Sequence, residues 1–141
     1  MKQHKILFFV PRHINAKDIH RELITHLQAC LSAEAYVNLV TSDAKKDAIR
    51  LSDYDIIHIF GCWSNSAYRL ASRAYEHNVP YLLTPLGALQ PWEMAQHRRS
   101  LLFSRQHKLT SKAAAVHVCG KLEQETFTHL GWNKRQEVIK N

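Results

Sequence analysis

The sequence predicts an α/β fold, namely a doubly wound, mainly parallel sheet of about six strands with helices on both faces. Short apolar runs of strand length alternate with segments of helical periodicity along the whole chain. The run Lys5–Val10 is apolar throughout instead of alternating, which is typical of a strand covered on both faces. Repeated strand–helix alternation implies right-handed crossovers, and such crossovers build a parallel sheet.

Three strands are predicted before Gly61, each separated by a helical segment. The helix after the first strand carries apolar residues at helical spacing, including Leu23 and Leu27, and Asn15 is placed to cap it. The elements expected here are strand Lys5–Val10, helix Ala16–Leu31, strand Tyr36–Thr41, short helix Asp43–Leu51 and strand Asp55–Phe60.

The second half continues the alternation with helix boundaries that have recognisable end signals. Ser64 is a preferred N-cap, Pro91 suits a first helical position, and Gly131 suits the residue after a helix. The helix after Ser64 is expected to bury Ala67, Leu70, Ala71, Ala74 and Tyr75. The expected elements are a helix from Ser64 to about His77, strand Val79–Thr84, helix Pro91–Lys112, strand Ala114–Val118, helix Lys121–Leu130 and strand Glu137–Ile139.

Composition restricts the class of protein. The chain has 141 residues, of which 45% are hydrophobic and 22% charged, as expected for one globular domain. It has no apolar run long enough to span a membrane and no signal-peptide core, so a cytoplasmic location is expected. The cysteines form no C-x-x-C pair, and no two histidines lie three or four residues apart, so no metal is predicted.

Glycine and proline residues follow the predicted strands, at the edge where open α/β sheets bind ligands. Tight turns alone also explain residues of these types. The sequence lacks G-x-G-x-x-G, the P-loop pattern and G-x-S-x-G, which argues against dinucleotide, P-loop and nucleophile-elbow enzymes. The candidate site therefore comprises the loops Pro11–Asn15, Ser42–Asp43, Gly61–Asn65, Pro85–Pro91 and Cys119–Lys121.

Two longer segments are more specific than the fold. One reads Asp-Ile-Ile-His-Ile-Phe-Gly-Cys-Trp-Ser over Asp55–Ser64, and the other reads Asn-Val-Pro-Tyr-Leu-Leu-Thr-Pro-Leu-Gly-Ala-Leu-Gln-Pro-Trp over Asn78–Trp92. Together they resemble the N-terminal domain of family 4 glycosyltransferases, which have the two-domain GT-B architecture. The segments Ala113–Glu125 and Glu137–Asn141 are similar to the family's A-D-A-V-H-A-T-S-E-x-E stretch and to the start of its interdomain connection.

The resemblance implies a retaining glycosyltransferase with a nucleotide-sugar donor and no cofactor. Residues 1–141 would form a single Rossmann-like domain on the acceptor side, and the donor-binding C-terminal domain is absent from this chain. The chain alone is then expected to be inactive. The acceptor would be a glycan or lipid-linked molecule of bacterial surface polysaccharide or glycolipid synthesis, at the inner face of the cytoplasmic membrane.

The chain departs from the family pattern in two loops. Arg12, His13 and Asn15 occupy the loop where the family has a glycine pair near the donor phosphates, and Leu86 replaces a histidine near the reacting sugar. Trp63 and Trp92 match the pattern, and each either stacks on a sugar or anchors its own loop. The candidate cleft residues are Arg12, His13, Asn15, Gly61, Trp63, Leu86, Gly87, Trp92, Lys121 and Glu123.

The formal net charge of +7 is concentrated in one segment. Residues 94–122 contain six bases and no acid, and the remainder of the chain is nearly neutral. Such a segment either docks on an anionic membrane surface or is a helix with one buried face and solvated bases. Two other hypotheses remain open, a nucleic-acid-binding α/β domain and a non-catalytic partner subunit of a glycosyltransferase. The surface residues concerned are Arg98, Arg99, Arg105, Lys108 and Lys112.

Overall fold

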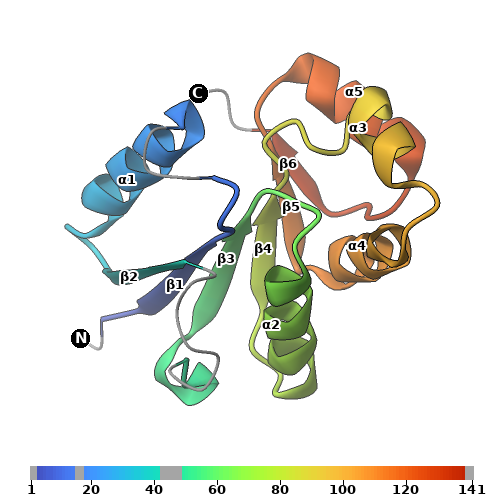
Figure 1. The fold of residues 1–141 in the computed structure, drawn as a ribbon. Coiled ribbons are helices and arrows are strands. Elements are labelled where there is room, and N and C mark those ends of the chain that lie inside the picture. Colours follow the sequence, from blue (N-terminus) through green and yellow to red (C-terminus); the bar gives the residue numbers. More distant parts are fainter. Residues whose placement is uncertain (1–2, 15–17, 42–48, 139–141) are drawn as a thin grey trace.

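The computed structural model describes residues 3–14, 18–41 and 49–138, which form one six-stranded parallel sheet with flanking helices (Figure 1). The strands lie in the order β2-β1-β3-β4-β5-β6, and each neighbouring pair is parallel. The predicted α/β class and Rossmann-like arrangement are confirmed. The elements are β1 (Lys5–Val10), α1 (Ile19–Leu31), β2 (Tyr36–Thr41), the 3₁₀ turn η2 (Leu51–Asp53), β3 (Ile56–Phe60), α2 (Asn65–Glu76), β4 (Tyr81–Thr84), α3 (Pro91–His97), α4 (Leu101–Lys112), β5 (Ala115–Val118), α5 (Lys121–Leu130) and β6 (Gln136–Val138).

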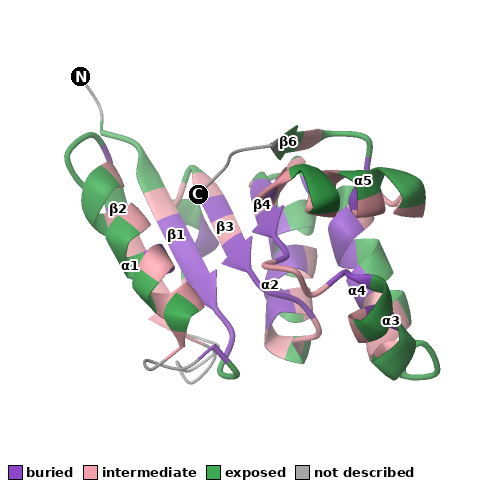
Figure 2. Cartoon of the chain, turned by 90° about the horizontal axis from the view of Figure 1, so that it is seen from above, coloured by how far each residue is buried: buried purple, intermediate pink, exposed green. Residues whose placement is uncertain are grey.

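The sheet separates two apolar clusters because successive side chains of a strand point to opposite faces. On β1, Leu7 and Phe9 belong to a cluster built with α2, α3, α4 and α5, whereas Phe8 and Val10 belong to a cluster built with α1. The central strands are almost wholly buried, and the helices keep exposed outer faces (Figure 2). The apolar character of β1 therefore reflects burial on both sides, as predicted.

The direction in which successive strands are added to the sheet reverses once, at β1. From β1 the chain moves to β2 on one side, and then returns to β3 on the other side and continues outward to β6. The loops that leave β1 and β3 therefore diverge to opposite sides of the sheet, which is where open α/β sheets form their ligand crevice.

The end signals of two helices act as predicted. The Ser64 hydroxyl accepts a hydrogen bond from the backbone N–H of Ala67 at the start of α2. Gly131 ends α5 in the left-handed region with φ 72°, a conformation that glycine adopts without steric strain. Both signals are local, so neighbouring residues suffice to identify them.

The single helix predicted over Pro91–Lys112 is wrong, because a turn at residues 98–100 separates α3 from α4. Ser100 has extended backbone angles, and its N–H and its hydroxyl donate to the His97 carbonyl at 2.9 and 3.0 Å. Serine side chains compete in this way with helical hydrogen bonds. The basic segment therefore does not lie along one continuous helix.

Smaller differences concern helix ends. The first helix starts at Ile19 and is capped by Asp18, whose carboxylate accepts from the His20 N–H, while the predicted cap Asn15 lies outside the described residues. Most of the predicted helix 43–51 also lies outside them. Tyr75 was expected to be buried but is 53% exposed, because its ring lies under the Lys112 ammonium at the surface.

Candidate functional site

A cleft of about 360 Å³ opens at the carboxyl ends of β1, β3 and β4. Three loops and the helices α1 and α3 contribute residues to it. The sequence predicted five of these residues, namely His13, Gly61, Trp63, Leu86 and Gly87. The remaining lining residues are Ile14, Asp18, His20, Cys62, Pro85, Ala88, Glu93 and His97.

Gly61 lets the loops after β1 and β3 approach each other. Its φ is 78°, and a Cβ built there would lie 2.9 Å from the Ile14 Cδ1 atom and 3.6 Å from the His13 Nε2 atom. A contact of 2.9 Å is closer than carbon atoms pack without displacement. Gly61 therefore fixes where the His13 ring enters the cleft.

The loop after β4 is built from two residues in the left-handed region. Leu86 has φ 56° and Gly87 has φ 79°. Two turns follow directly, closed by hydrogen bonds from Ala88 N–H to the Pro85 carbonyl and from Gln90 N–H to the Gly87 carbonyl. A leucine in this region is strained, so the surrounding contacts must hold the Leu86 side chain in the cleft wall.

Glu123 stabilises the loop after β4 through a hydrogen bond with its backbone. Its carboxylate accepts hydrogen bonds from the backbone N–H groups of Cys119 and Gly87, while Oε1 is buried without a hydrogen-bond partner among the described residues. Burial raises the pKa of Glu123, and the two N–H groups oppose that shift. Glu123 therefore connects the loops after β4 and β5 and does not line the cleft.

Trp63 joins three segments of the chain. Its indole N–H donates to the Ala88 carbonyl at 2.9 Å, and its backbone N–H donates to Gln106 Oε1 at 2.9 Å. The His97 ring stacks on the indole with centroids 4.3 Å apart and an interplanar angle of 12°. Because His97 covers one face of the ring, the contacts favour the loop-anchor interpretation of Trp63 over sugar stacking.

Besides Glu123, three other predicted cleft residues are not part of the cleft lining. Trp92 is 62% exposed at the start of α3, and Arg12 and Lys121 are exposed in the loop after β1 and at the start of α5. Trp92 follows the cleft-lining loop and directly precedes the cleft residue Glu93 in α3. Asn15 lies outside the described residues.

Sequence patterns did not reveal four polar cleft residues, namely Asp18, His20, Glu93 and His97. Glu93 and His97 lie four residues apart on α3, a spacing that places both on one helix face. Burial lowers the pKa of His13, whereas the carboxylates of Asp18 and Glu93 act in the opposite direction. The cleft thus combines a neutral imidazole with carboxylates, a set that can bind and orient hydroxyl groups.

Two bases of the positive segment are engaged by α2. Arg105 donates to Asn65 Oδ1 at 2.7 Å and its guanidinium lies over the Tyr68 ring, while the Lys112 ammonium lies 4.5 Å from the Tyr75 ring centroid. Arg98 and Arg99 instead lie exposed in the turn between α3 and α4. The described residues contain no group of three His, Cys, Asp or Glu side chains arranged to hold a metal ion.

Comparison with known families identifies the family of the chain. Residues 18–141 match the family described as "Glycosyl transferase 4-like domain". The chain belongs to that family. The match includes both motif segments and the loops that line the cleft after β3 and β4, so the expected relationship to family 4 glycosyltransferases is confirmed. A search of curated proteins with the sequence of this chain found no match.

Proposed function

We propose that the chain is the acceptor-side domain of a retaining glycosyltransferase. The enzyme transfers a sugar from a nucleotide-sugar donor to a glycan or lipid-linked acceptor used for a bacterial surface polysaccharide or glycolipid. A second, donor-binding domain completes its active site. The family match supports the enzyme class, and the position of the cleft at the switch point of the sheet supports the assignment of the site.

The polar cleft residues suit recognition of sugar hydroxyl groups. His13 lines the cleft from the loop after β1, and Glu93 and His97 line it from α3. An uncharged imidazole supplies one hydrogen-bond donor and one acceptor, and a carboxylate supplies two acceptor oxygens. In this proposal these side chains orient the acceptor, and the exposed Trp92, next to Glu93 in the sequence, offers an apolar face to a pyranose ring.

Leu86 makes this cleft wall apolar where relatives carry a histidine near the reacting sugar. Its side chain packs beside the α1 cluster and adds no hydrogen-bonding group to the cleft. The sugar hydroxyl groups must therefore be bound by the other polar residues, including His13. We expect an acceptor that presents an apolar surface to Leu86, because an unpaired hydroxyl in that position is unfavourable.

The contacts of the basic segment do not favour a nucleic-acid-binding function. Two of its six bases are held against α2 by Asn65, Tyr68 and Tyr75. The aromatic residue Phe103, which lies within the basic segment, is partly buried and packs against Trp63 and Trp132. A single-strand platform needs exposed aromatic faces beside a continuous basic groove.

The exposed turn between α3 and α4 fits a membrane surface better. It presents Arg98 and Arg99, and it lies between the exposed side chains Trp92 (62%) and Leu101 (75%). Bases attract anionic headgroups, and exposed apolar residues enter the interface. In the described part of the chain, no helix is long and apolar enough to cross a bilayer. We therefore propose peripheral attachment through this turn.

The proposal is tested by expressing the complete reading frame that contains these residues and supplying uridine- and guanosine-diphosphate sugars with candidate acceptors. We expect sugar transfer with retention of the anomeric configuration, followed by NMR, and no transfer by residues 1–141 alone. Transfer with inversion contradicts the proposed reaction. A reading frame without a donor-binding domain contradicts the proposed domain organisation.

A further inference from the structure

The sheet has one face that the described helices only half cover. From β3 to β6 the chain adds each new strand on the same side of the previous one. Right-handed crossovers therefore place α2, α4 and α5 on one face of the sheet. The connection from β1 to β2 adds a strand on the opposite side of β1, and it places α1 on the other face of the sheet. On the α1 side, the strip formed by β3, β4 and β5 therefore remains open along one flank of α1.

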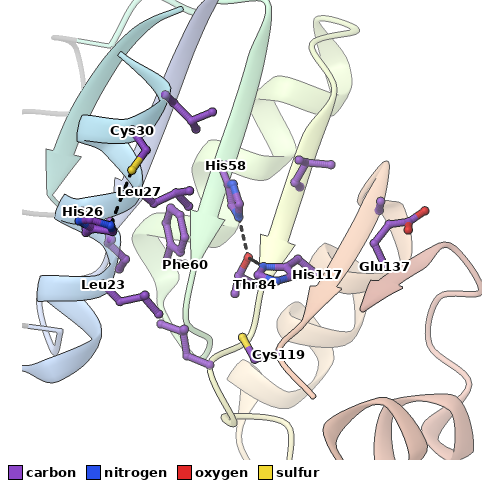
Figure 3. A pocket seen from close by; sticks show the side chains of 15 residues that line it. Leu23, His26, Leu27, Cys30, His58, Phe60, Thr84, His117, Cys119 and Glu137 are labelled. Atoms are coloured by element: carbon purple, nitrogen blue, oxygen red, sulfur yellow. Dashed lines mark hydrogen bonds between the residues drawn. The ribbon is translucent and has the colours of Figure 1, made fainter. Parts of the chain in front are cut away.

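This strip and the flank of α1 enclose a groove of about 400 Å³, which lies within the range of natural ligand sites (Figure 3). Leu23 and Leu27 of α1 form one wall and face Phe60 on β3. The strand residues Leu82 and Ala115 continue the apolar floor towards β6, where Glu137 marks the far edge.

The polar side chains in the floor bond to one another. The Thr84 hydroxyl lies 2.6 Å from His58 Nε2 and 3.1 Å from His117 Nδ1. Burial, with a smaller contribution from His117, lowers the pKa of His58 to about 3, so this ring is uncharged at neutral pH. Polar floor groups that hydrogen-bond to one another can contact hydrocarbon without being left unpaired.

The groove and the cleft adjoin at Leu86. This residue lines both spaces, together with Phe60 and Thr84 in the groove and with Gly87 in the cleft. A molecule with a polar head in the cleft and an apolar tail would therefore meet polar groups at one end and, beyond Leu86, a mainly apolar lining in which Thr84, His58 and His117 bond to one another.

We propose that the groove binds the hydrocarbon tail of an amphiphilic acceptor whose sugar-accepting head lies in the cleft. This inference rests on the proposed function for the identity of the amphiphile as acceptor, and it selects the lipid-linked class from the two acceptor classes. The tail would lie along α1 over β3, β4 and β5, with Leu86 at the junction between head and tail.

The test titrates residues 1–141 with n-alkyl glucosides from hexyl to dodecyl, each below its critical micelle concentration. We expect the dissociation constant to fall about fourfold per added methylene until the groove is filled, and then to level off. Binding should also slow iodoacetamide alkylation of Cys30 and Cys119, which line the groove, and leave the buried Cys62 unchanged.

Two neighbouring alanines provide matched variants. Ala115 lines the groove, whereas Ala114 is exposed and lies outside its lining. Ala115→Leu should make the affinity level off at a shorter alkyl chain, and Ala114→Leu should reproduce the native profile. An affinity independent of chain length, or equal profiles for both variants, overturns the inference. The inference is also overturned if light scattering shows a dimer in which Cys30 and Cys119 resist alkylation before any alkyl glucoside is added.

The experiments distinguish a failure of the groove inference from a failure of the proposed function. Alkyl binding is measured without a sugar donor, so chain-length dependence in a protein that transfers no sugar would contradict the transferase proposal alone. Efficient transfer to a water-soluble acceptor by a protein that ignores alkyl chain length would contradict the groove inference alone.

Discussion

At the scale of single residues, Gly61 controls the shape of the cleft. Gly61→Ala adds a methyl group to a residue at φ 78° and places it 2.9 Å from Ile14. We expect the free energy of unfolding, measured in urea, to fall by about 1–3 kcal/mol. Gly87→Ala is the matched control, because Gly87 has φ 79° but no atom within 4 Å of the added carbon. Equal losses in the two variants would show that the close approach contributes nothing.

His58 makes stability depend on pH. Its pKa is about 3 in the folded chain and about 6.5 when unfolded, so the folded state binds fewer protons between these values. Stability from this group is complete above pH 6.5 and declines as the pH falls towards 3. Between pH 7 and pH 5 we expect the native chain to lose about 2 kcal/mol more than His58→Gln in urea unfolding. Identical pH profiles would contradict the neutral state of His58.

At the scale of elements, Trp63 fastens α3 and the loop after β4 to the end of β3. Trp63→Phe removes the hydrogen bond to the Ala88 carbonyl and weakens the stack on His97. We expect a loss of about 1–2 kcal/mol and faster amide exchange over residues 86–97. Trp92→Phe is the control, since that indole is 62% exposed, and it should change neither quantity.

Local signals predicted most elements, and they failed where tertiary contacts decide. The apolar runs identified β1 and β3, and Ser64 and Gly131 identified two helix ends, because each signal depends on neighbouring residues. The break at Ser100 was missed, since helical periodicity continues on both sides of it and only the contacts with the His97 carbonyl reveal the turn.

At the scale of the whole molecule, local sequence signals again predict only part of the cleft. The structure brings His13, Gly61 and Leu86 together in one cleft, because they follow strands whose carboxyl ends share one edge of the sheet. Glu93 and His97 reach the cleft only because α3 packs against Trp63, a contact between residues far apart in the sequence. The open groove was also unpredictable, since it depends on strand order.

The exposed turn between α3 and α4 predicts charge-dependent membrane attachment. Arg98→Ala combined with Arg99→Ala should weaken binding to vesicles containing phosphatidylglycerol by about 30-fold at low salt, because each base near such a surface contributes about 1 kcal/mol. The control removes the exposed bases Arg69 and Lys134, which lie on α2 and after α5. Equal effects of the two double variants in co-sedimentation would assign the attraction to net charge.

The most direct measurement compares kcat/KM for the acceptor in the complete enzyme and in two histidine variants. His13 lines the cleft, whereas His129 is exposed in the last turn of α5. If the cleft binds the acceptor, His13→Ala lowers kcat/KM at least about tenfold, equivalent to about 1.4 kcal/mol, and His129→Ala leaves it unchanged. Full activity of His13→Ala, or equal losses in both variants, would contradict the assignment of this cleft as the acceptor site.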